Sequence, residues 1–182
     1  MRKSPRRGLV LTLTILTIAG TAAAGTPSNE ELASDARDAM ARLQRGDSTL
    51  KPVLDSAVGY AIFPEVSNGG FIFGGSGGRG EVYEGGKLVG HAKISQETVG
   101  ARAEGQKFIE LILFKRKSAL TRFKKDRFEL SSEATANAAA QGAAAKAKYA
   151  DGVAIIVLPI GGLVAEASIG GQRLKFIPLE GD

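Results

Sequence analysis

The residues best suited to chemistry in this chain are a run of glycines, one histidine and several glutamates. "GGSGGRG" at 74–80 contains the spacing G-x-G-x-x-G, which in dinucleotide-binding folds follows a strand and opens a helix. Here "EVYEGGKLVGHAKI" follows, with two strand-like pieces and no helix start to face a pyrophosphate. We interpret these glycines as hairpin residues, which supply positive φ at turns and let neighbouring backbones approach closely. No nucleotide is expected.

The sequence also gives little support for a catalytic or metal-binding site. His91 is the only histidine and lies in the strand-like stretch "LVGHAKI", with no nucleophile elbow beside it. One histidine and no cysteine exclude the common zinc sites, and the chain has no calcium loop of the D-x-D-x-D type. Glu81 and Glu84 would point to opposite faces of one strand. We therefore expect no enzyme activity, no cofactor and no metal.

Charge is concentrated in one segment, "FKRKSALTRFKKDRF" at 114–128, which has seven cations and a single acid, Asp126. A helix over 117–125 would place Leu120 and Phe123 on one side with cations beside them. Cations for anionic head groups and apolar side chains for shallow burial are typical of a membrane-surface element. The alternative is a solvated helix face whose apolar residues pack inward. The predicted lipid-binding residues are Lys115, Arg116, Lys117, Leu120, Arg122, Phe123, Lys124, Lys125 and Arg127.

The first 24 residues have the three parts of a secretory signal peptide: basic "MRKSPRR", apolar "GLVLTLTILTIAG" and "AAA" for cleavage. An uncleaved anchor is the alternative. Without its four cations the net charge falls from +5 to +1, which gives no support for nucleic-acid binding. The protein is expected to be exported, periplasmic or secreted, and peripherally associated with a membrane.

The elements that would position these residues follow from periodicity. Residues 28–45 are expected to form a helix, because Ser28 and Glu31 make a capping box before an apolar stripe, and 48–57 a shorter one. From Gly59 onward, short β-branched or aromatic stretches alternate with glycine, which is typical of an antiparallel sheet or barrel. The Ala-rich segment 134–150 is either a helix or a long mobile loop.

We therefore predict an α+β fold: a β-rich single domain, with an antiparallel sheet or barrel-like core of short Gly-punctuated strands. An N-terminal helix and one or two short helices would pack on it. The expected organisation is a cleaved signal peptide at 1–24, an N-terminal helical region at 25–55 and the β-rich domain at 56–182.

Five stretches occur in an order that resembles the SYLF domain family: "SAVGYAIFPEV", "GGFIFGGSGGRGEV", "GQKFIELILF", "SALTRF" and "GLVAEASIGGQRLKF". The resemblance implies a compact β-rich fold with helices packed on it, binding of anionic phospholipids, and neither catalysis nor nucleotide binding. Eukaryotic members are also described as actin-binding, but the export signal makes actin unsuitable as a natural partner. The alternative function is an envelope protein-interaction or structural module without direct lipid binding.

Overall fold

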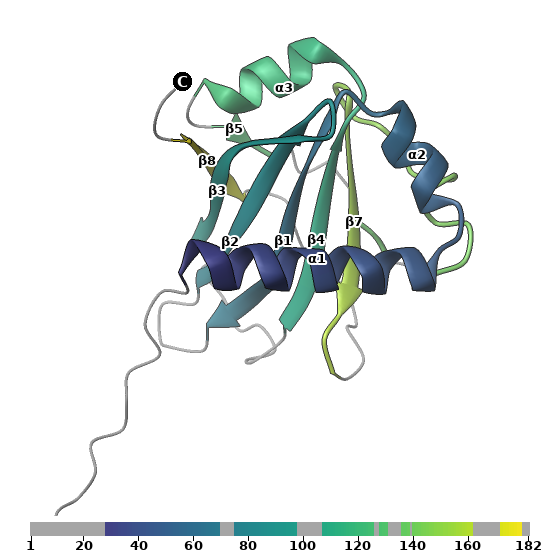
Figure 1. Ribbon diagram of the computed structural model, residues 1–182, viewed down its shortest axis with the longest axis horizontal. Helices are drawn as coiled ribbons and strands as arrows, with labels where there is room; N and C mark the ends of the chain where they lie inside the picture. Colours follow the sequence, from purple (N-terminus) through teal and green to yellow (C-terminus); the bar gives the residue numbers. More distant parts are fainter. Residues whose placement is uncertain are drawn as a thin grey trace, which may run out of the picture.

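The computed structural model describes residues 28–69, 75–97, 107–125, 128–130, 136–138, 140–161 and 172–179. The predicted signal peptide lies outside these residues. Within them the chain forms three helices and one sheet of eight strands, so the α+β class is confirmed (Figure 1). The helices are α1 (Asn29–Gly46), α2 (Leu50–Ser56) and α3 (Lys117–Lys124). The strands are β1 (Gly59–Gly69), β2 (Gly75–Glu84), β3 (Lys87–Glu97), β4 (Lys107–Phe114), β5 (Phe128–Glu129), β6 (Ala136–Ala138), β7 (Val153–Pro159) and β8 (Arg173–Pro178).

The strand order in the sheet is β5-β8-β3-β2-β1-β4-β7-β6, and every neighbouring pair is antiparallel except β6 with β7. Three strands separate β8 from β4, which in a flat sheet would place them roughly 19 Å apart. Gln172, directly before β8, nevertheless donates a hydrogen bond of 3.2 Å to Glu110 on β4. The sheet therefore curls into a half-barrel with these two side chains on its concave side.

The two faces of the sheet build two separate cores. On the concave side, Phe63, Phe114 and Ile155 pack against Leu120 and Phe123 of α3. On the other face α1 crosses the strands, and its buried residues pack against the strand residues on that side (Figure 1). Every residue of β4 after Lys107 is buried because alternate side chains enter different cores, and all of them except Glu110 are apolar.

The predicted helix at 28–45 is confirmed as α1. Ser28 Oγ accepts a hydrogen bond from the Glu31 N–H (3.2 Å), and the Glu31 carboxylate accepts one from the Ser28 N–H (2.7 Å). This capping box fixes the start of the helix because it satisfies two otherwise unpaired backbone donors. The apolar stripe of the helix is buried at Leu32, Ala36, Ala39 and Leu43.

The glycines serve two different purposes. Gly85 and Gly86 form the two-residue turn between β2 and β3 with φ of 56° and 78°, the positive values that a tight hairpin needs. The glycines of 75–80 are not turn residues, because they lie within β2. A Cβ on Gly80 would be 2.5 Å from the carbonyl oxygen of Ile62 on β1. Close approach of two strands is therefore the reason for glycine at position 80.

Pro64 lies inside β1, a strand with partners on both sides, where it cannot donate a ladder hydrogen bond. The pairing with β2 shifts register between Ile62 and Glu65, and the pairing with β4 shifts between Phe63 and Val66. The Phe-Pro dipeptide therefore marks a β-bulge that bends the central strand, which helps the sheet to curl.

The Ala-rich segment 134–150, predicted to be either a helix or a long mobile loop, is not a helix in its described part. Its described part contains the short strand β6 and a series of turns at 141–146. These turns are fixed by Asp47, which follows the end of α1 and accepts hydrogen bonds from the backbone N–H groups of Gly142 (3.0 Å) and Ala144 (2.7 Å). Anchoring by a distant carboxylate replaces the regular hydrogen bonding of a helix.

Candidate functional site

The cations predicted to bind lipid surround α3, at the end of the sheet where β1 begins (Figure 1). We call the described members the basic surface. They are Lys115, Arg116, Lys117, Arg122, Lys124 and Lys125. All are exposed except Lys124, which is half-buried. Arg127 lies outside the described residues, so the structure does not place it.

Two arginines of the basic surface are held by the turn that precedes β7. Arg122 Nη2 donates a hydrogen bond of 2.9 Å to the carbonyl oxygen of Asp151. The guanidinium of Arg116 lies against Gly152, where a Cβ would be 2.8 Å from Arg116 Nε. The turn thus contacts one arginine before the start of α3 and one in its last turn, and a side chain that is already held loses less entropy when it binds a ligand.

Two lysines of the basic surface also have partners. Lys124 Nζ forms an ion pair with Glu84 at the end of β2 and lies 5.7 Å from the centre of the Phe176 ring. Lys115 Nζ lies 5.2 Å from the centre of the Tyr149 ring, within the range of a cation–π interaction. Lys124 is therefore partly neutralised, whereas the aromatic contact of Lys115 leaves its charge uncompensated.

Lys117 and Lys125 are exposed, and within the part of the chain that the structure describes the side chain of neither has a hydrogen-bond or ion-pair partner. Lys117 is the first residue of α3, whose N-cap, Arg116, makes no side-chain capping hydrogen bond. The first turn of α3 contains no acidic residue. The Lys117 side chain therefore lies at a helix N-terminus without acidic residues, an arrangement that favours anions.

Leu120 and Phe123 are not on the surface, so their predicted insertion into a membrane is wrong. Leu120 is 1% exposed and Phe123 is 0% exposed. The Phe123 ring packs against Phe114, Phe128 and Phe176, with centroid distances of 5.0, 6.0 and 5.9 Å. The apolar side of α3 closes the concave core, which is the inward-packing alternative considered for this helix.

A second group of polar residues lies on the α1 face of the sheet. Glu81 on β2 is directly opposite His91 on β3, and the Tyr83 hydroxyl donates a 2.6 Å hydrogen bond to Glu81. Burial raises the pKa of Tyr83, and the hydrogen bond to Glu81 raises it further. A pocket of about 190 Å³ lies nearby, between α1 and the stacked rings of Tyr60 and Tyr83. Neither Glu81 nor His91 lines this pocket.

The sequence reasoning missed the contact between Glu110 and Gln172, both of which are 0% exposed. The signal was present in "KFIELILF", because a glutamate inside an apolar strand is rarely buried without a specific partner. The partner could not be identified, since it lies 62 residues away in the sequence.

Comparison of the chain with models of known protein families and with curated proteins finds no match. Among the described residues, no helix is both long and apolar enough to span a bilayer. No group of three or more histidine, aspartate or glutamate side chains is arranged to hold a metal ion in the same part of the chain.

Proposed function

We propose that this protein is an exported SYLF-like domain that binds anionic phospholipid at a membrane surface, without catalysing a reaction. The observation that carries the proposal is the basic surface. It gathers six cations on and beside one short helix, in a mature chain whose expected net charge is only +1.

The local environment of these cations supports the proposal. Lys117 and Lys125 have no anionic partner among the described residues, and Lys115 contacts only an aromatic ring. Such a concentration of like charge opposes folding through self-repulsion, so a ligand of opposite charge would relieve a cost that the free protein carries. A membrane with anionic head groups has the charge opposite to that of this surface.

The burial of Leu120 and Phe123 changes how the binding would work. Because the apolar side of α3 packs inward, the basic surface supplies charge and hydrogen bonds rather than apolar area. Each lysine or arginine close to an anionic surface contributes about 1 kcal/mol, which salt screens. We therefore expect binding that is reversible, dependent on the fraction of anionic lipid and weakened by salt.

The test is co-sedimentation with vesicles of phosphatidylglycerol and phosphatidylcholine, compared with phosphatidylcholine alone. Replacing Lys117 and Lys125 together by glutamate should weaken binding to the anionic vesicles at least tenfold. That expectation takes about 1 kcal/mol for each lost cation, to which each added anion contributes repulsion. These two residues suit the test because their side chains are exposed and, among the described residues, make no hydrogen bond or ion pair.

The matched control replaces Arg42 and Lys93 by glutamate, since both are exposed on the α1 side of the molecule. This variant has the same change in net charge but keeps the basic surface intact. It should bind anionic vesicles much more tightly than the Lys117→Glu, Lys125→Glu variant. If both variants lose the same amount of affinity for anionic vesicles, only the net charge of the protein matters. If the wild type binds phosphatidylcholine vesicles as tightly as anionic ones, the proposal is ruled out.

A further inference from the structure

Glu110 is buried on the concave face of the sheet, between Phe108 and Ile112 of the hydrophobic core, where a charged group is unfavourable. It lies on β4, directly opposite Phe63 on β1 and Val157 on β7. Its side chain is 0% exposed, and so is that of Gln172. An ionised carboxylate buried in this way needs several hydrogen-bond donors or a cation to offset its loss of hydration.

The hydrogen bonds around Glu110 do not meet this need. Gln172 Nε2 donates to Glu110 Oε2 at 3.2 Å, and among the described residues this is the one hydrogen bond of the carboxyl group. Within the same part of the chain, Glu110 Oε1 and Gln172 Oε1 are both buried without a hydrogen-bond partner. Both atoms are acceptors when the glutamate is ionised, so two acceptors are left without a donor. One added proton on Glu110 would remove both deficits.

No cation in the described part of the chain compensates Glu110. β7 has no titratable residue, and on the concave side β2 and β3 present Val82, Ala92 and Ile94. Glu65 on β1 and Lys107 on β4 are half-exposed and pair with each other at 2.7 Å. Arg173 and Lys175 of β8 and Glu129 of β5 are exposed, and Lys124 pairs with Glu84. The charged and titratable residues in the middle of β2 and β3 alternate with Val82, Ala92 and Ile94 and so lie on the α1 face; they are Arg79, Glu81, His91 and Lys93.

We propose that Glu110 and Gln172 form a proton-dependent latch between β4 and β8. When Glu110 holds a proton on Oε1, this hydroxyl donates to Gln172 Oε1 while Gln172 Nε2 donates to Glu110 Oε2. The two side chains then form a closed carboxylic acid–amide pair in which every buried polar atom has a partner. When Glu110 loses this proton to solvent, the hydrogen bond from Glu110 Oε1 to Gln172 Oε1 is lost. The buried carboxylate then has a single hydrogen-bond donor, Gln172 Nε2.

The pKa of Glu110 in the folded protein sets the direction in which pH changes the strength of the latch. Burial raises the pKa of Glu110 to about 7, and the hydrogen bond from Gln172 opposes this rise in part. A carboxyl group with a raised folded-state pKa keeps its proton after the opened or unfolded chain has lost it. The latch is thus strongest in acid, weakens as the pH rises from about 4.5 to about 7, and changes little above that.

β8 is the element that the latch controls. β4 is paired with a long strand on each side, β1 and β7, whereas β8 is paired with β3 on one side and only with the two residues of β5 on the other. Opening at β8 therefore disrupts fewer contacts than opening at β4. Phe176 of β8 packs against Phe123 of α3, so release of β8 would also remove part of the contact that holds α3 on the core.

Hydrogen exchange of the β8 amides at pH 5 and pH 8, corrected for the intrinsic pH dependence of exchange, tests the latch. In the wild type, the equilibrium constant for opening of β8 should rise roughly 70-fold from pH 5 to pH 8. This is the ratio expected when the pKa of Glu110 is 4.5 in the opened chain and about 7 in the folded chain. In Glu110→Gln the rise should disappear, because a neutral amide of the same shape keeps the ring closed at both pH values. The control Glu129→Gln, an exposed residue beside β8, should behave like the wild type.

Infrared spectroscopy gives a second readout on the folded wild-type protein. At pH 5.5 the spectrum should contain the carbonyl stretch of a buried protonated carboxylic acid, and this band should be missing from Glu110→Gln. The latch would be disproved by a wild type without that band, by the same pH dependence of β8 opening in Glu110→Gln, or by failure of Glu110→Gln to fold. This test involves no lipid, so its result is separate from that of the vesicle assay.

Discussion

Replacement of Asp47 by asparagine should destabilise the protein by an amount that depends on pH. The Asp47 side chain, in a residue only 2% exposed, accepts four hydrogen bonds, from the Thr49 N–H (2.9 Å) and hydroxyl (2.7 Å) and from the N–H groups of Gly142 and Ala144. Burial raises the pKa of this carboxyl group, but the hydrogen bonds outweigh burial and lower it to about 2. Asparagine would turn its amide donor toward at least one of these donors.

The magnitude follows from the lowered pKa. A shift from 3.8 to about 2 corresponds to about 2 kcal/mol of stability at neutral pH. The group's folded-state pKa is depressed, so this contribution is present above about pH 4 and is lost as the pH falls toward 2. In the wild type about 1 kcal/mol of it should be gone by pH 3. We expect Asp47→Asn to lower the free energy of unfolding by about 2 kcal/mol at pH 7 and by clearly less at pH 2.5.

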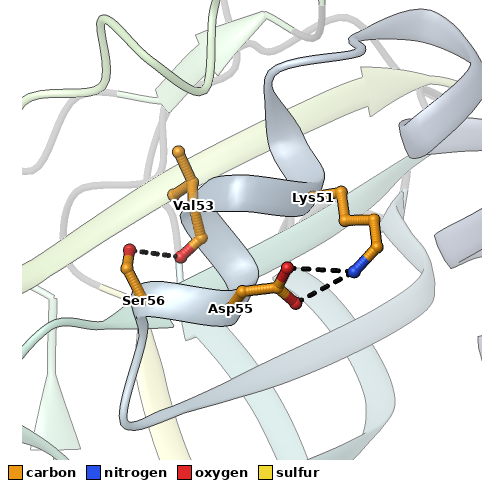
Figure 2. A network of polar contacts seen from close by, with 4 residues as sticks. All are labelled: Lys51, Val53, Asp55 and Ser56. Carbon is orange, nitrogen blue, oxygen red and sulfur yellow. Dashed lines mark hydrogen bonds and ion pairs between the residues drawn. The ribbon is translucent and has the colours of Figure 1, made fainter.

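The assay is urea unfolding at both pH values, with Asp55→Asn as the matched control. Asp55 is an exposed aspartate in α2 whose carboxylate pairs with Lys51, at 2.9 Å for the closer oxygen (Figure 2). Exposed i,i+4 pairs contribute only about 0.3–0.5 kcal/mol, so this variant should stay close to the wild type. The reasoning is refuted if Asp47→Asn costs no more than Asp55→Asn at pH 7, or if its cost is the same at both pH values.

Two further substitutions test the core and the glycines. Phe123→Ala should lower the free energy of unfolding by about 3–5 kcal/mol, because it removes a fully buried aromatic side chain. Urea unfolding measures this, with Lys125→Ala as the control whose stability should stay close to that of the wild type. Gly80→Ala should lower the melting temperature, since its Cβ would collide with the Ile62 carbonyl. Gly77→Ala should not, because the nearest atom to its Cβ would be 3.7 Å away; equal effects of the two alanines would contradict the close-approach explanation.

The parts of the fold that local chemistry decides could be predicted from the sequence. The capping box at Ser28 and the stripe from Leu32 to Leu43 placed α1 to within a residue, and short β-branched stretches placed most of the strands. Each of these signals acts within a few residues of the chain. The Gly-Gly turn at 85–86 belongs to the same class, since both residues need positive φ.

What could not be predicted depends on distant partners. An amphipathic helix such as α3 has the same sequence pattern whether its apolar side faces a membrane or a protein core. The burial of Phe123 could therefore be recognised only once the fold was known. Gly80 is required by the backbone of β1, and the Ala-rich segment is held by Asp47, which lies 95 residues from Gly142. The cations of the basic surface were found because side-chain charge is evident from residue type alone.

The two proposals meet at α3, and together they constrain how the protein could respond to its surroundings. The outer side of this helix displays the basic surface, while its inner side rests on Phe176 of β8. In the proposed latch, acid favours the closed pair that holds β8, which would keep α3 packed on the core and its cations clustered. Salt weakens the attraction of those cations for anionic lipid without affecting a buried neutral pair. Lipid binding should therefore respond to salt directly and to pH through Glu110, and Glu110→Gln should remove the part of the pH response that passes through β8 while leaving the salt response unchanged.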